Sequence, residues 1–293
     1  MRILTRPDFD GVVCAVLLRD ALDAEAPVVW TQPNDIQQGM MSVRSDDILA
    51  NLPFDERCGL WFDHHFSNQI DQPFEGAFAI APSAAGVIFD YYQGRFTRDF
   101  DELVTATDKI DSADLNLAEI ESPEDHPHIL LSMTLAGRTT EDLIYADRLV
   151  DLLQKNPLEA VLADREVAQR CQEVVSQNRV YKGYLQEYTR MEAEVSITDF
   201  RGIDNPPDGN RFLVYALFPD AVVNVKLYHY YGKLVVKVGH SILKDGCRVN
   251  VGKLLADFYG GGHRGAGACR FPIEQADDLL PQIMAALLAN EPN

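Results

Sequence analysis

The residues best suited to chemistry are Asp63, His64 and His65, which directly follow the apolar run Leu60–Phe62. Carboxylate oxygen and imidazole nitrogen are both ligands of divalent metals. If the apolar run is a short buried strand, the triplet lies at its carboxyl end, where a parallel sheet usually holds its ligand. The alternative is that the two histidines are only exposed polar residues of a loop. The triplet alone does not decide between these readings.

A pair of carboxylates near the start of the chain strengthens the metal hypothesis. Asp8 and Asp10 are two residues apart, so in extended backbone they share a face, and both precede the helix-like segment 12–22. One carboxylate is enough to cap a helix. Two close negative charges repel each other unless a cation bridges them, so the pair favours a metal site. A further acidic cluster lies at residues 106–114.

A glycine-rich run at residues 260–267 contains His263 and Arg264. Its letters fit a dinucleotide-binding fingerprint, but that fingerprint follows a strand and opens a helix. This run follows a helix-like segment and leads into an apolar strand, so that interpretation is rejected. Small residues let backbone N–H groups approach an anion, and the two side chains add donors. A purely structural glycine turn is the alternative.

Strand-like and helix-like segments alternate in the front part of the chain, which predicts a doubly wound α/β domain with a mostly parallel sheet. The expected strands are 2–5, 28–31, 48–52, 58–62 and 77–81, with helices at 12–22, 83–92 and, as a long connector, about 140–190. The back part predicts a smaller α/β domain with a mixed sheet. Its expected strands are 194–198, 212–218, 222–230, 234–238 and 268–272, with helices at 249–259 and 274–289. The expected domains are 1–190 and 195–293.

Charge is unevenly distributed along the 293 residues. The net charge is −19, from 26 basic and 45 acidic residues, yet residues 195–293 carry ten of each. Residues 211–270 even have a local basic excess, with nine basic and three acidic residues. The acidic balance argues against long nucleic acid as a partner. It suits a cation site in the first domain and an anion site in the second.

Other features of the sequence point to the cytoplasm. The apolar run Val12–Leu18 is too short to span a bilayer, and no secretory signal pattern occurs at the start. The five cysteines are scattered without a CxxC pair, as expected for reduced thiols. We therefore expect a cytoplasmic protein without a membrane partner, whose apolar helix faces would suit a homodimer.

In their order along the chain, these pieces resemble the DHH phosphoesterase superfamily. They are Asp8-x-Asp10-Gly11, Asp63-His64-His65, the acidic cluster at Asp108 and the glycine-rich run 260–267. That family includes a single-strand exonuclease, nano-RNases, cyclic-dinucleotide phosphodiesterases, manganese pyrophosphatases and exopolyphosphatases. The resemblance covers both the DHH domain and its associated C-terminal domain, and is best to the exopolyphosphatase-like or nano-RNase-like branch with short substrates.

The resemblance implies a two-manganese site between the domains, with Mg²⁺ as the alternative ion and one or two ions bound. The implied metal ligands are Asp8, Asp10, His64, Asp108 and Asn51. The implied catalytic residues are Asp63, which supports the site, His65, which faces the phosphate, and Arg6. The implied substrate-binding residues are Gly261, Gly262, His263 and Arg264. Two such ions lower the pKa of a shared water and neutralise the phosphoryl oxygens.

Two positions depart from the family pattern. Arg6 stands where a metal-binding histidine is expected, and a guanidinium cannot ligate a metal because it stays protonated. Asn51 stands where a bridging aspartate is expected and offers only one neutral oxygen. Arg6 could instead replace the missing cation by binding phosphate directly. A further alternative concerns the acidic cluster, where Asp111 could take the role assigned to Asp108.

Two functions therefore compete. The first is a metal-dependent phosphohydrolase, an enzyme that cleaves phosphoester or phosphoanhydride bonds of a small phosphorylated substrate at the inter-domain cleft. Short polyphosphate, a short oligonucleotide or a nucleotide are the candidate substrates. The second is a catalytically degraded relative that binds a nucleotide or phosphate without hydrolysing it, which the residues at positions 6 and 51 favour.

Overall fold

The computed structural model describes residues 1–137 and 139–293, and these fall into two compact units. The first unit consists of Met1–Asp114 and Pro123–Gln172, and the second of Leu115–Ser122 and Glu173–Asn293. The long helix α9 (Arg165–Tyr188) runs across the division. Its last two thirds, from Glu173, therefore belong with the second unit, whereas the first domain expected from the sequence runs to residue 190.

The first unit contains a sheet of five parallel strands in the order β2-β1-β3-β4-β5. The strands are β1 (Ile3–Thr5), β2 (Val28–Trp30), β3 (Ile48–Ala50), β4 (Leu60–Asp63) and β5 (Gly76–Phe78). From β1 the chain first adds a strand on one side, and it then adds the remaining three on the other. The order reverses between β1 and β3, which makes that point the topological switch of the sheet.

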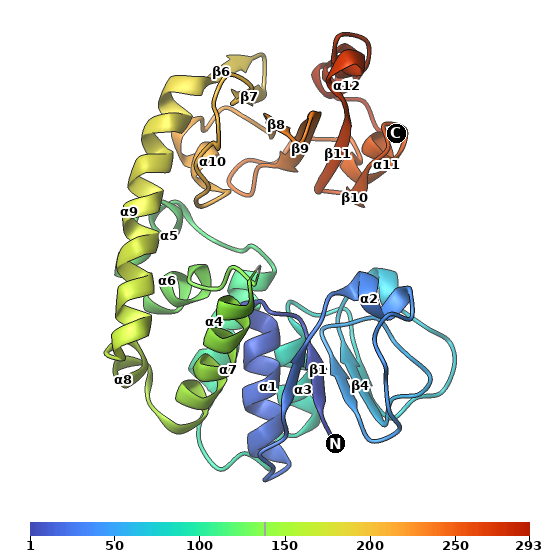
Figure 1. The fold of residues 1–293 in the computed structure, drawn as a ribbon, viewed down its shortest axis with the longest axis vertical. Helices are drawn as coiled ribbons and strands as arrows, with labels where there is room; N and C mark the ends of the chain where they lie inside the picture. Colours follow the sequence, from blue (N-terminus) through green and yellow to red (C-terminus); the bar gives the residue numbers. More distant parts are fainter. Residues whose placement is uncertain (138) are drawn as a thin grey trace. The chain divides into compact units, whose positions relative to one another are not determined.

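Helices flank this sheet on both faces, as Figure 1 shows for α1 and α3 on one side and α2 on the other. Helix α1 is buried along almost its whole length, which explains why its sequence is apolar at nearly every position. On the opposite face, Trp61 packs with Leu4, Leu49 and the ring of Phe54. The helices of this unit are α1 (Phe9–Ala21), α2 (Pro33–Gln37), α3 (Ala84–Tyr91), α4 (Asp101–Asp111), α6 (Pro127–Met133), α7 (Thr140–Lys155) and α8 (Leu158–Leu162).

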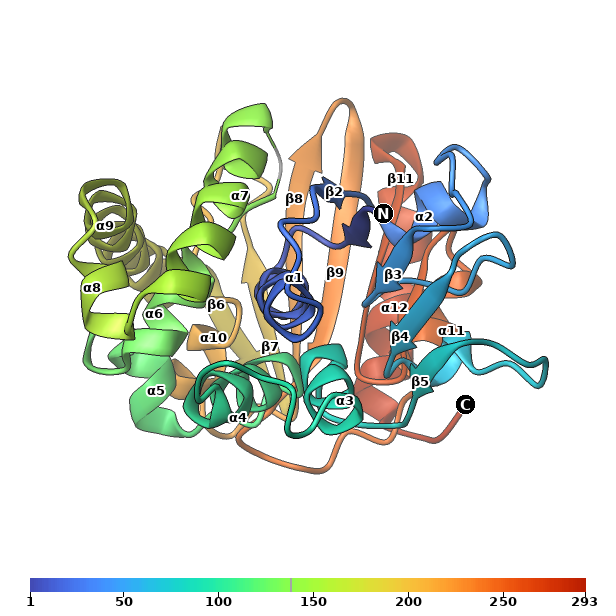
Figure 2. The same ribbon diagram turned by 90° about the horizontal axis from the view of Figure 1, so that it is seen from below.

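The second unit contains a mixed sheet in the order β10-β11-β9-β8-β7-β6, in which only the β7–β8 pair is parallel. The strands are β6 (Thr189–Glu192), β7 (Val195–Asp199), β8 (Val223–Tyr230), β9 (Lys233–His240), β10 (Gly261–His263) and β11 (Ala266–Pro272). Helices α11 (Val251–Ala256) and α12 (Ala276–Ala289) supply buried side chains to the core on one face of this sheet (Figure 2). The short helices α5 (Leu117–Glu121) and α10 (Leu213–Leu217) contact each other.

The predicted fold class is confirmed: a doubly wound parallel sheet is followed by a smaller α/β unit with a mixed sheet. The strand expected at 212–218 is wrong, because Leu213–Leu217 forms the short helix α10. A short apolar run does not distinguish a strand from a buried helical turn by its periodicity. The glycine-rich run was not expected to pair, yet Gly261–His263 forms β10. Among the described residues, no helix combines the length and apolar character needed to cross a bilayer.

Candidate metal centre

The predicted metal residues of the first unit follow three neighbouring strands at their carboxyl ends. Asp8 and Asp10 come after β1, Asn51 directly follows β3, and His64 directly follows β4. The pair β1 and β3 is the topological switch point, where ligands bind in open α/β sheets. The topology therefore brings together side chains that lie more than forty residues apart in the sequence.

Asp10 joins the end of β1 to the start of α3. Its carboxylate accepts hydrogen bonds from the backbone N–H groups of Ala84 (3.0 Å) and Ala85 (2.8 Å), and the residue is only 1% exposed. Burial, then the charge of Asp111 and that of Asp8, raises the pKa of Asp10 well above its usual value. The two backbone hydrogen bonds oppose this rise, but the net effect is that the protein holds the carboxylate in a place that disfavours its negative charge.

His64 directs one ring nitrogen at these carboxylates. Its Nδ1 lies 3.0 Å from the carbonyl oxygen of Ala81, which requires a proton on Nδ1 and leaves the lone pair on Nε2. That Nε2 lies 3.4 Å from Asp111 Oδ2 and 3.9 Å from Asp10 Oδ2. It is buried and has no hydrogen-bond partner among the described residues. Metal-binding histidines are commonly fixed by such a bond from the other ring nitrogen.

The last turn of α4 decides between the two aspartates that the sequence left open. Ser83 donates a hydrogen bond of 2.5 Å to Asp108, which lies beside the start of α3. Asp111, the last residue of α4, instead joins Asp10 and His64 in a cluster whose ligand atoms lie within 4.8 Å of one another. Burial and the nearby charge of Asp8 raise the pKa of Asp111, against the opposing effect of His64. The geometry therefore favours Asp111 over Asp108 as a ligand.

This cluster fits a divalent cation. Two carboxylates with raised pKa values face one imidazole lone pair, and that lone pair is aimed at them without a hydrogen-bond donor. A cation would neutralise the like charges and satisfy the nitrogen at once. The donor set of two oxygens and one nitrogen suits manganese.

Arg6, Asp8 and Asn51 form a separate group next to this cluster. Asp8 caps α1 by accepting a hydrogen bond of 2.9 Å from Gly11 N, and its Oδ1 also accepts one of 3.1 Å from Asn51 Nδ2. Its Oδ2 lies 3.1 Å from Arg6 Nε as an ion pair, although the angle is too bent for a hydrogen bond. Asn51 is 1% exposed and has a left-handed backbone with φ of 56°. Its Oδ1 is buried and has no hydrogen-bond partner among the described residues.

Asp63 and His65 form an oriented pair beside the cluster. The buried Asp63 bonds His65 Nδ1 at 2.8 Å through Oδ1, and its Oδ2 accepts a bond of 2.6 Å from Asn68 Nδ2. Because its Oδ1 bonds Nδ1 of His65, Asp63 is suited to positioning that ring. The ligand atoms of Asp63, His64 and His65 also lie within 4.8 Å of one another. Asn68 was missed in the sequence analysis, and its only signal there is its position five residues after Asp63.

In the second unit, the predicted substrate residues lie on a tight hairpin. His263 pairs with Ala266 across β10 and β11, so Arg264 and Gly265 form the turn, and the side chains of His263 and Arg264 are exposed. Gly262 has φ of 151°, and a Cβ there would lie 2.2 Å from the carbonyl oxygen of Ala266. The glycines thus allow close backbone packing, and the two donors project at the tip.

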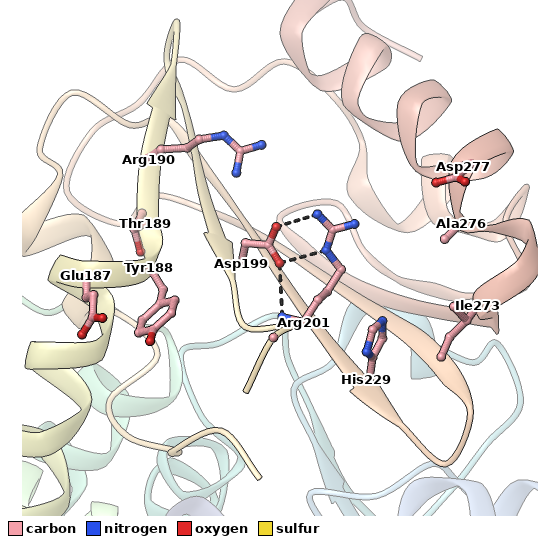
Figure 3. A pocket seen from close by; sticks show the side chains of 11 residues that line it. Glu187, Tyr188, Thr189, Arg190, Asp199, Arg201, His229, Ile273, Ala276 and Asp277 are labelled. Carbon is pink, nitrogen blue, oxygen red and sulfur yellow. Dashed lines mark hydrogen bonds and ion pairs between the residues drawn. The ribbon is translucent and has the colours of Figure 1, made fainter. Parts of the chain in front are cut away.

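An open hollow of about 730 Å³ elsewhere in the second unit contains none of the predicted site residues. Figure 3 shows Asp199 and Arg201 at its centre, joined by two side-chain hydrogen bonds of 2.9 and 2.6 Å. This pair neutralises itself, unlike the acidic cluster of the first unit. The hollow is therefore not a second candidate for the metal chemistry.

Solved structures resemble this chain over nearly its whole length. No family model and no curated protein matches the sequence. Among solved structures, the pGpG-specific phosphodiesterase PggH from Vibrio cholerae is similar over 99% of both chains, with 28% identity and a TM-score of 0.86. The resemblance to the DHH phosphoesterase superfamily is thereby confirmed.

Two less similar solved structures share the fold. An exopolyphosphatase-related protein from Bacteroides fragilis has 13% identity and a TM-score of 0.53 over 98% of this chain and 93% of its own. RecJ from Thermus thermophilus, in complex with Mn²⁺, has 15% identity and a TM-score of 0.56 over 98% of this chain and 51% of its own. The likeness to the phosphodiesterase supports a phosphoester hydrolase.

Proposed function

We propose that this chain is a metal-dependent phosphodiesterase that hydrolyses a short linear oligonucleotide, with a guanine dinucleotide such as pGpG as the leading substrate. The observation that carries the proposal is the likeness to the pGpG-specific phosphodiesterase over 99% of both chains. The cluster of Asp10, His64 and Asp111 supports the metal dependence. Manganese is the leading ion, and a cytoplasmic location is part of the proposal.

We assign a separate role to each side chain of the site in the first unit. Asp10, His64 and Asp111 would hold the ion, which when bound lowers the pKa of a water and neutralises phosphoryl oxygens. Asp63 fixes His65 through Nδ1, so His65 Nε2 is left to bond a phosphate oxygen or to protonate the leaving group. Arg6, whose side chain is 31% exposed, would bond a phosphoryl oxygen through its terminal nitrogens.

In the second unit, His263 and Arg264 are proposed as phosphate-binding side chains at the hairpin tip, with Gly262 as the close-packed support and Gly261 beside it on β10. Both side chains are exposed donors on the more basic part of the chain. The basic side chains of this part would attract an anionic substrate, which the acidic first part of the chain would repel.

The direct test is release of mononucleotides from pGpG by the purified chain with manganese, compared with an adenine dinucleotide and a short polyphosphate. We expect turnover of pGpG that stops when the ion is chelated. The competing function is a non-catalytic binder, which the pairing of Arg6 with Asp8 favours. Retained pGpG binding without product, in the presence of manganese, would establish that alternative.

A nucleobase is favoured over polyphosphate by two exposed apolar side chains near the cluster. Phe66 directly follows His65 and is 75% exposed, and Ile80 directly precedes Ala81, which bonds His64, and is 71% exposed. The exposed ring of Phe66 suits stacking of a base, which contributes about 1–3 kcal/mol, and Ile80 offers a further apolar contact.

Phe66→Ala should therefore raise the KM for pGpG about tenfold, because about 1.4 kcal/mol of stacking corresponds to that factor. Steady-state kinetics check this, with an abasic dinucleotide as the matched substrate. The abasic substrate should be hydrolysed equally by both proteins. An unchanged KM for pGpG would show that Phe66 does not contact the base.

A further inference from the structure

The carboxylates of the site differ in whether a positively charged side chain already pairs with them. Asp8 has both oxygens engaged by the protein: Oδ1 accepts from Gly11 N (2.9 Å) and Asn51 Nδ2 (3.1 Å), and Oδ2 lies 3.1 Å from Arg6 Nε. Its charge is thus compensated without any ion. A metal bound to Asp8 would have to compete with a guanidinium that stays protonated.

Asp10 and Asp111 differ from Asp8 because no positively charged guanidinium or ammonium group is paired with them. Among the described residues no lysine or arginine forms an ion pair with either, and His64 Nε2 lies 3.4 Å from Asp111 Oδ2 and 3.9 Å from Asp10 Oδ2. The His64 side chain is 9% exposed, and its Nε2 is buried without a hydrogen-bond partner. A cation would supply the positive charge that the two carboxylates lack and a partner for His64 Nε2.

Asn51 offers an ion less than a bridging aspartate would, because its one available oxygen, the buried Oδ1, carries no charge. The amide presents its Nδ2 to Asp8 Oδ1 at 3.1 Å. The reverse orientation would place the amide oxygen against a carboxylate oxygen, so the assignment follows from the charges. Asn51 is only 1% exposed, and its amide donates to Asp8 where a bridging aspartate would instead offer a carboxylate oxygen.

We propose that this chain binds one divalent ion, on Asp10, His64 and Asp111, and that the Arg6 guanidinium, held by Asp8, replaces the second ion of the two-ion arrangement. Asp10, His64 and Asp111 fit one ion, whereas Arg6, Asp8 and Asn51 do not offer the ligand set of a second. Arg6 supplies a fixed positive charge to the phosphate but cannot activate a water. This inference deepens the proposed function and rests on it for the phosphate that Arg6 would meet.

Metal stoichiometry tests the proposal without reference to activity. The purified chain is titrated with Mn²⁺ by calorimetry, and its loaded form is examined by electron paramagnetic resonance. We expect one ion per chain and the six-line spectrum of an isolated Mn²⁺. Two ions per chain with an exchange-coupled spectrum would overturn the proposal, and so would a folded chain that binds none.

Variants separate the two groups of side chains. Asp111→Asn should abolish the single ion, whereas Asp8→Asn should leave the stoichiometry at one. The double variant Arg6→His with Asn51→Asp restores a ligand set and should gain a second ion, while Arg57→His, at an exposed ion pair with Asp55, is the control that should not. If the double variant does not fold, the stoichiometries of the unmodified chain and of Asp8→Asn still decide.

The number of bound ions and the hydrolysis of pGpG are measured separately, so the inference and the proposed function can fail independently. One bound ion with no hydrolysis of pGpG would leave the inference standing and remove the catalytic function. Two bound ions with hydrolysis would support the function and overturn the inference. In the one-ion case, Arg6→Ala should raise the KM for pGpG without changing the number of ions.

Discussion

Asp111→Asn should lower the affinity of the chain for manganese at least about 100-fold, the upper end of the cost of losing even an outer-shell partner of a metal. The variant removes one of the two carboxylates that face His64 Nε2. Hydrolysis of pGpG should fall with it, by roughly a factor of 1,000 or more if electrostatic stabilisation of at least about 4 kcal/mol is lost. Calorimetric titration and steady-state kinetics measure the two effects.

Asp108→Asn is the matched control, because it lies on the same helix and keeps an oxygen that can accept from Ser83. It should change manganese affinity less than about tenfold. A second readout excludes a merely structural effect of Asp111→Asn. Since burial and the charge of Asp8 raise the pKa of Asp111, its neutral variant should raise the melting temperature of the metal-free protein. A stronger metal effect from Asp108→Asn would reverse the assignment.

Gly11→Ala should disrupt the Arg6–Asp8 turn and destabilise the protein by about 3 kcal/mol, at the upper end of what overpacking usually costs. A Cβ at Gly11 would lie 2.0 Å from the carbonyl oxygen of Arg6 and 2.8 Å from Thr5 Oγ1. The backbone carbonyl cannot rotate away as a side chain can. Gly11 N also donates the bond that caps α1 through Asp8, so the helix start shifts with the turn.

Urea unfolding measures this effect, and Gly183→Ala is the control. Gly183 lies inside α9, and a Cβ there would meet nothing within 4 Å. That substitution should stabilise the protein by about 0.5–1 kcal/mol, because alanine is the better helix former. Equal effects at the two glycines would contradict the steric argument.

Local patterns in the sequence were sufficient for most of the fold. The run Val12–Leu18 predicts a buried helix, and the structure has it inside α1. Alternation of such segments was enough to predict a doubly wound sheet. Residues 212–218 failed because their apolar run has no period that separates a strand from a short helix such as α10. The strand β10 was missed because glycine has low strand propensity.

The site was predictable in its residue types but not in its pairings. Asp108 and Asp111 are three residues apart on α4, so they project from similar sides of the helix and the sequence does not rank them. Only the three-dimensional position of Ser83 shows which one is already bonded. Likewise, sequence shows that Arg6 and Asn51 are unusual, but not that both turn toward Asp8.

The wide spacing of Asp10, His64 and Asp111 along the chain has a kinetic consequence. These residues come together only when β1, β4 and the end of α4 have assembled, so the unfolded chain offers no comparable site. An ion that binds the native state alone stabilises it by mass action, by about 2.7 kcal/mol at a concentration one hundred times Kd. Because contacts between distant segments form late, this stabilisation should appear mainly as slower unfolding. Resistance to proteolysis of the first unit would then report the supply of metal around the protein.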